Sequence, residues 1–77
     1  MSISAYVFIE CKGEAARDVA KEAMKIQGVK RADSTTGPYH VIVLVQASSI
    51  DILGNDIVTR LHGVPGVLRT HTHLIAD

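Results

Sequence analysis

The sequence predicts an α+β domain in which two βαβ units share one antiparallel sheet. The first observation is an internal repeat with a spacing of 38 residues, in which Gly28-Val29 and Arg31 recur as Gly66-Val67 and Arg69. The second is that each copy passes from strand-like alternation to helical periodicity and back again. The third is the length, because 77 residues suffice for one domain only. Together these features favour a ferredoxin-like βαββαβ fold, a four-stranded sheet with both helices on one face.

The first copy contains a strand, a helix and a second strand. Ile3 to Glu10 is apolar on both alternating faces, which predicts a strand. Glu14 to Gln27 carries small and apolar residues at helical spacing, and Gly28 is expected to end this helix. Val29 to Thr35 is more polar, as is typical of a strand at the edge of a sheet.

The second copy begins with a nearly continuous apolar run, Val41 to Ala47, which is typical of a strand that is covered on both faces. Ser48 and Ser49 are candidate N-caps of the helix that follows, and Gly63 is expected to end it. Val67 to Ala76 is then predicted as the last strand.

Composition and charge narrow the class of protein. Eight basic residues balance eight acidic ones, so the chain lacks the basic surface that binding to nucleic acid requires. No apolar run approaches the ~20 residues needed to cross a bilayer, and the first residues do not resemble a cleavable leader. Cys11 is the only cysteine, which excludes a disulfide within the chain. We therefore expect a cytoplasmic protein that binds neither DNA nor membranes directly.

The apolar residues of the two central strands exceed what two helices can cover. Tyr6 and Phe8 alternate with the apolar residues of the other face of the first strand, and Ile42 and Leu44 do the same in the third. Monomers rarely leave such an apolar surface in water. We expect a second copy to cover it, sheet against sheet, in a two-fold homodimer. The alternative is that loops or a twisted edge hide part of the face.

The sequence contains no recognisable catalytic motif and no glycine-rich phosphate loop. Cys11 is interpreted as a small filler residue. The protein is therefore expected not to be an enzyme. A small enzyme on a ferredoxin-like scaffold is kept as an alternative, with Tyr39 and His40 as its only acid–base candidates.

Histidine is the one unusual feature, since His71 and His73 are separated by a single residue on a predicted strand. Period-two alternation places both rings on one face, roughly 6.5–7 Å apart along the strand. This spacing suits Zn or Cu, although two imidazoles form an incomplete site that needs a ligand from another subunit. A metal-binding module is thus a second alternative function, and a polar sheet edge is the simpler explanation.

Short motifs in the second half of the chain carry a more specific signal. Thr36-Gly37-Pro38-Tyr39-His40 precedes the apolar strand, Val64-Pro65-Gly66-Val67 follows the second helix, and Thr70-x-Thr72 lies in the last strand. In this order and spacing they resemble the effector-binding regulatory domain of the leucine-responsive regulatory protein/AsnC family of transcription factors. The resemblance extends from Ala5 to Ala76.

The resemblance implies a stand-alone regulatory domain, residues 1–77, without the helix-turn-helix of the full-length family members. It implies a dimeric α/β barrel that assembles into a higher oligomer and binds an amino-acid effector between subunits. Carried over by position, the effector-binding residues are Gly37, Tyr39 and His40, with Thr70 and Thr72 as weaker candidates. The implied role is to sense an effector, or to modulate transcription through a full-length regulator. One departure is that His40 stands where the family commonly has an acidic residue.

Overall fold

The computed structural model describes residues 2–76. Its elements are, in chain order, β1 (Ile3–Cys11), the 3-10 turn η1 (Gly13–Ala15), α1 (Ala16–Ala23), β2 (Val29–Ser34), β3 (Val41–Ala47), the π-helical segment η2 (Ile52–Val58), α2 (Thr59–His62) and β4 (Val67–Leu74).

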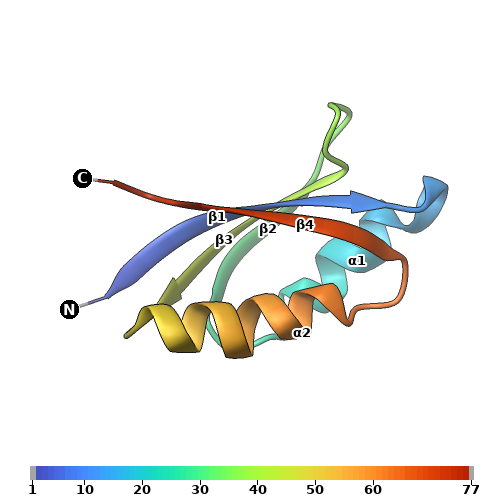
Figure 1. Ribbon diagram of the computed structural model, residues 1–77. Helices are drawn as coiled ribbons and strands as arrows, with labels where there is room; N and C mark the ends of the chain where they lie inside the picture. Colours follow the sequence, from blue (N-terminus) through green and yellow to red (C-terminus); the bar gives the residue numbers. More distant parts are fainter. Residues whose placement is uncertain (1, 77) are drawn as a thin grey trace.

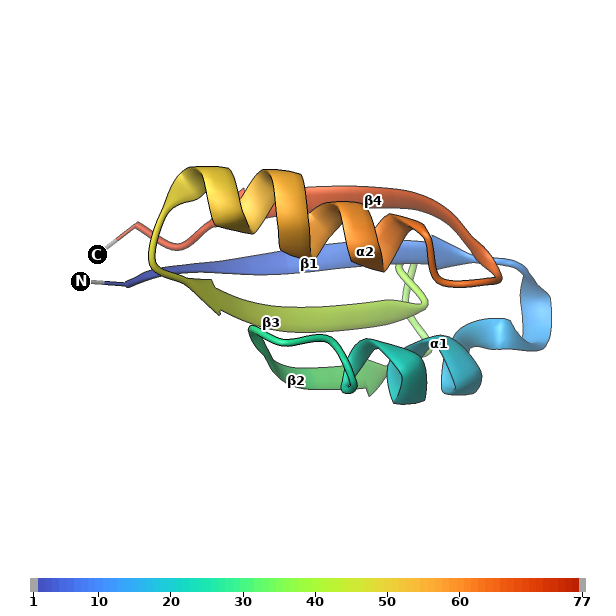
Figure 2. The same ribbon diagram turned by 90° about the horizontal axis from the view of Figure 1, so that it is seen from below.

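The strands form one antiparallel sheet in the order β2-β3-β1-β4. Both helices lie on the same face of this sheet (Figures 1 and 2), where α1 packs against β2 and β3, while η2 packs against β3 and α2 against β4. None of the described helices lies on the opposite face. The ferredoxin-like βαββαβ fold predicted from the repeat is therefore confirmed. Within residues 2–76 no helix is long and apolar enough to cross a membrane.

The core lies between the helices and one set of alternating strand residues. Ala5, Val7 and Ile9 of β1 are fully buried, as are Val41 and Val43 of β3. Val45 of β3 is also fully buried, and the helices contribute Val19, Leu53, Ile57 and Leu61 to the core. No polar or charged side chain among the described residues is buried. This face is consequently held by aliphatic packing, as the aliphatic composition requires.

The internal repeat is visible in the two turns that lead from a helix into a strand. Gly28 and Gly66 have positive φ angles of 100° and 97°, which non-glycine residues rarely adopt. Both are also closely packed, because a Cβ at Gly28 would overlap Cδ1 of Ile57 and a Cβ at Gly66 would lie 2.8 Å from Cβ of Ala15. The two glycines therefore recur because both helix-to-strand turns require the same backbone geometry and close packing.

Several element ends differ from the sequence prediction. The sequence predicts the first helix over Glu14 to Gln27, but α1 ends at Ala23. The backbone N–H groups that follow donate hydrogen bonds to carbonyls three residues earlier, as in Ile26 N–H to Ala23 O at 3.0 Å, which ends the α-helical pattern. Gly28 therefore lies in the turn rather than at the helix end. The last strand ends at Leu74 and not at Ala76.

The second helix is irregular. It begins where Ser49 Oγ accepts a hydrogen bond from the amide of Ile52 at 3.2 Å, so one of the two predicted caps is used. Its middle widens into the π-helical segment η2, and the hydroxyl of Thr59, the first residue of α2, donates a hydrogen bond to the carbonyl of Gly54 at 3.2 Å. Gly54 has low helix propensity and Thr59 competes for its carbonyl, which favours the wider turn.

Candidate functional site

The open face of the sheet, turned away from the helices, holds most of the aromatic and histidine side chains. Tyr6 and Phe8 of β1 lie in register with His73 and His71 of β4. The rings of Phe8 and His73 are in edge contact, with centroids 5.0 Å apart. The two histidines thus share one face of β4, and this face is the open one.

The connection between β2 and β3, residues 35–40, rises on the same side of the sheet (Figure 1). Its ends are closed by Thr35, whose amide donates to the carbonyl of His40 at 2.8 Å and whose hydroxyl donates to the carbonyl of Tyr39. The Tyr39 ring then lies 5.1 Å from the ring of Phe8 and 5.5 Å from that of His71. The connection therefore folds toward the open face and contacts both β1 and β4.

His40 ties this connection to the end of β1. Its backbone amide donates to the carbonyl of Ile9 at 2.9 Å, and its ring Nδ1 accepts a hydrogen bond from the amide of Cys11 at 2.9 Å. An accepting Nδ1 must carry a lone pair, so this geometry assigns any ring proton to Nε2. His40 therefore bonds to the residue of β1 that precedes Glu10 and to the one that follows it.

Glu10 and His71 form a hydrogen-bonded carboxylate–imidazole pair on the open face. Glu10 Oε2 lies 2.8 Å from His71 Nε2, and the two side chains are 34% and 41% exposed. The hydrogen bond from His71 is the main reason that the pKa of Glu10 lies below its ordinary value, with Arg69, opposite Glu10 on β4, acting in the same direction. At neutral pH the site thus holds a carboxylate next to a cluster of basic side chains.

The structure brings together only part of the effector site expected from the sequence. Tyr39 and His40 share the connection with Gly37, where a Cβ would meet no described atom within 4 Å. Thr70 and Thr72 are in register with Ile9 and Val7, whose side chains are buried on the helix-covered face. In a single protomer these threonines consequently lie on the opposite face from Tyr39.

The two histidines proposed for a metal have separate neighbours. His71 is paired with Glu10, whereas the His73 ring contacts Phe8. Within residues 2–76 no group of three or more histidine, cysteine or acidic side chains gathers in a way that would hold a metal. A site at His71 and His73 therefore stays a prediction that depends on a ligand from another subunit.

The acid–base candidates of the alternative enzyme function do not act on each other. The ring of His40 faces β1 and that of Tyr39 contacts Phe8 and His71. Cys11 is buried, and burial raises the pKa of its thiol, which keeps it protonated. The interpretation of Cys11 as a filler residue agrees with this placement.

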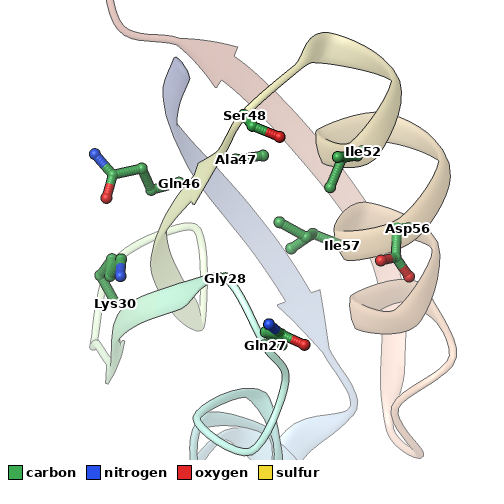
Figure 3. A pocket seen from close by; sticks show the side chains of 9 residues that line it. All are labelled: Gln27, Gly28, Lys30, Gln46, Ala47, Ser48, Ile52, Asp56 and Ile57. Carbon is green, nitrogen blue, oxygen red and sulfur yellow. The ribbon is translucent and has the colours of Figure 1, made fainter. Parts of the chain in front are cut away.

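A separate cleft of about 440 Å³ lies at the other end of the sheet, between the turn before β2, the end of β3 and the second helix (Figure 3). Figure 3 shows Lys30 and Gln46 on one side of it and Asp56 on the other. Asp56 is already bonded to Arg60 at 2.7 Å and Gln46 to Ser2 at 3.0 Å. None of the residues expected to bind an effector or a metal lines this cleft.

Sequence reasoning missed Glu10. The signal that could have found it is a single carboxylate that ends a strand otherwise apolar on both faces. Its partner His71 is 61 residues away in the chain, so the pairing itself has no local signature.

The comparison with protein families settles the class of the domain. The Lrp/AsnC ligand binding domain matches residues 4–77, nearly the whole chain. The chain belongs to this family. The expected resemblance is therefore confirmed, and the family is a regulatory, ligand-binding one. No curated protein sequence matches the chain.

Solved structures agree on the fold. TTHA0845 from Thermus thermophilus is 27% identical with a TM-score of 0.88, and the match covers 97% of this chain and 94% of that one. Escherichia coli AsnC is 20% identical with a TM-score of 0.86, over 97% of this chain and 51% of AsnC. The feast or famine regulatory protein Rv3291c from M. tuberculosis, complexed with L-methionine, is 24% identical with a TM-score of 0.74, over 97% of this chain and 50% of that one.

Proposed function

We propose that the protein is a stand-alone regulatory module that binds an amino-acid effector at a subunit interface beside Gly37, Tyr39 and His40. The observation that carries the proposal is the placement of residues 35–40, whose Tyr39 contacts the open face of a domain that belongs to a ligand-binding family. The L-methionine complex of the M. tuberculosis relative supports an amino acid as the class of effector.

The open face is also the surface through which the protein dimerises in this proposal. It carries Tyr6, which is 44% exposed, and the half-buried Phe8, Ile42 and Leu44. A second copy packed on it would form the dimeric barrel, and further dimers would complete the effector site, with Thr70 and Thr72 contributed by another subunit. Such a cytoplasmic assembly would act on transcription through a regulator that carries a helix-turn-helix, because the neutral chain has little attraction for DNA.

The test combines native mass spectrometry with a thermal-shift screen of the twenty amino acids, followed by calorimetry of each hit. We expect a dimer or a multiple of it, and at least one amino acid that binds at millimolar concentration or below. A ligand at ~100 times its Kd adds about 2.7 kcal/mol to the free energy of unfolding, which is a clear shift in melting temperature. A stable monomer, or the lack of any binder at millimolar concentration, would overturn the proposal.

Gly37 provides a specific variant for this test. A Cβ at this position meets open space, and its φ is not in the positive range, so Gly37→Thr should fold normally. If the effector approaches the backbone here, the added side chain should weaken binding by at least ~10-fold without a change in the melting temperature of the free protein. Unchanged binding would place the effector elsewhere.

A second candidate function is a metal site shared between subunits. The observation that favours it is the proximity of the Glu10 carboxylate to His71, which places an oxygen ligand 2.8 Å from an imidazole nitrogen. Together with His73 or a residue of another subunit, these atoms would suit Zn or Cu.

A further inference from the structure

We infer that Glu10 receives the ammonium group of the amino-acid effector, in the place of the acidic residue that His40 replaces. The inference rests on the proposed function and deepens it, because it assigns the recognition of the positive end of a zwitterion to a residue outside the expected motif.

The backbone holds Glu10 in a defined position. The pairing of β1 with β4 shifts its register between Glu10 and Cys11, and such irregularities re-aim side chains near functional sites. On the other side of β1, His40 bonds to the carbonyl of Ile9 and to the amide of Cys11. The residue before Glu10 and the residue after it are thus both fixed to the connection that carries Tyr39.

In a single protomer the carboxylate remains partly accessible in this position. Glu10 is 34% exposed and its partner His71 is 41% exposed. A pair at this exposure is screened by water and contributes little net free energy, so an incoming ammonium group can take the place of the imidazole. An ammonium group has three N–H donors, so it can also donate a hydrogen bond to the second carboxylate oxygen of Glu10.

The surrounding charges select for a zwitterion rather than an anion. Arg69 lies opposite Glu10 on β4 and helps to lower its pKa, and its guanidinium would attract the carboxylate of a ligand whether or not Glu10 is present. On the open face the other strand carboxylate, Asp33, is on β2 and is bonded to Arg31 at 2.7 Å. Glu10 is therefore the acidic group on this side of the face that lies next to the connection bearing Tyr39.

The experiment compares two ligands and two matched variants by calorimetry. The ligands are the tightest binder among the twenty amino acids and the same molecule without its α-ammonium group. The variants are Glu10→Gln, which keeps the shape and removes the charge, and Glu22→Gln, which makes the same change at a glutamate of α1 that bonds to Lys25 at 3.1 Å. We expect Glu10→Gln to weaken the amino acid by about 10- to 100-fold and the deaminated acid by less than ~2-fold. Glu22→Gln should change neither.

Each other outcome has a definite meaning. If Glu10→Gln weakens both ligands equally, Glu10 only supports the structure of the site and the inference is wrong. If Glu10→Gln has no effect on either ligand, the inference also fails while the proposed function stands. If the wild type binds none of the twenty amino acids, the proposed function fails first.

His71→Ala gives an independent measurement, because it removes the competing imidazole and should leave amino-acid binding equal or tighter. A loss of binding in His71→Ala that equals the loss in Glu10→Gln would contradict the replacement of the imidazole by the ammonium group.

Discussion

The two faces of the sheet use the same strands for different purposes. The helix-covered face takes Val7, Ile9 and Val43, all with no exposed surface, and holds the fold. The adjacent positions Phe8, Glu10 and Ile42 belong to the open face and are only half-buried. Because successive side chains of a strand point to opposite faces, the same strands supply an aliphatic core on one face and aromatic rings, imidazoles and a carboxylate on the other. The side chains able to bind a ligand or a second copy of the chain therefore lie on the open face, which the helices leave uncovered.

The largest expected effect comes from a charge placed on either side of β3. Val43→Asp buries an unpaired carboxylate under the helices and should cost on the order of 4 kcal/mol or more, enough to prevent folding at any protein concentration. Ile42→Asp, its neighbour on the open face, should act through assembly and shift the protein from dimer to monomer. Circular dichroism and sedimentation separate the two effects. An Ile42→Asp protein that remains a dimer would show that the open face is not the interface.

A second contrast concerns glycine. Gly66→Ala should destabilise the protein by about 1–3 kcal/mol, because its φ is positive and its Cβ would lie 2.8 Å from that of Ala15. Gly37→Ala, in the connection near the open face, should change stability by less than ~0.5 kcal/mol. Chemical denaturation measures both. Equal costs at the two positions would contradict the idea that only the covered side is tightly packed.

The pH dependence of stability tests the Glu10–His71 pair. Because the folded state lowers the pKa of Glu10 from 4.5, the pair stabilises the protein at neutral pH, and this contribution is lost as the pH falls below 4.5 through the folded-state value. The melting temperature of wild type should therefore exceed that of Glu10→Gln at pH 7, and the difference should shrink toward pH 3. A difference that grows on acidification would have the wrong sign and would contradict the pairing.

The smallest expected effect is that of metal. If a subunit interface completes a site at His71 and His73, Zn²⁺ or Cu²⁺ should raise the melting temperature by a few degrees through linkage to the folded state. The double variant His71→Ala, His73→Ala should abolish this rise and leave the metal-free stability nearly unchanged. A metal response that survives the double variant, or its absence in wild type, would leave these histidines as polar residues on the face.

Much of the fold followed from local pattern. The bounds of β3, Val41–Ala47, agree with the apolar run, and the recurrence of Gly28 at Gly66 corresponds to two equivalent turns. These features can be predicted because burial in a strand and a positive φ each select particular residue types at local positions of the sequence. The end of α1 was not readable, since its last residues have good helix propensity and the tight turn at Ile26 depends on packing against the core.

The sequence by itself determined the βαββαβ order, the aliphatic core, the shared face of His71 and His73, and the family. Only the tertiary structure decided which carboxylate pairs with His71, the ring that Tyr39 contacts. Glu10 meets His71 across 61 residues of chain, and the amide of Cys11 meets His40 across 29. Such pairs arise from strand order and register, in which β1 lies between β3 and β4. No local pattern encodes a contact of this kind, because the energy of the pair is available only after the sheet has formed.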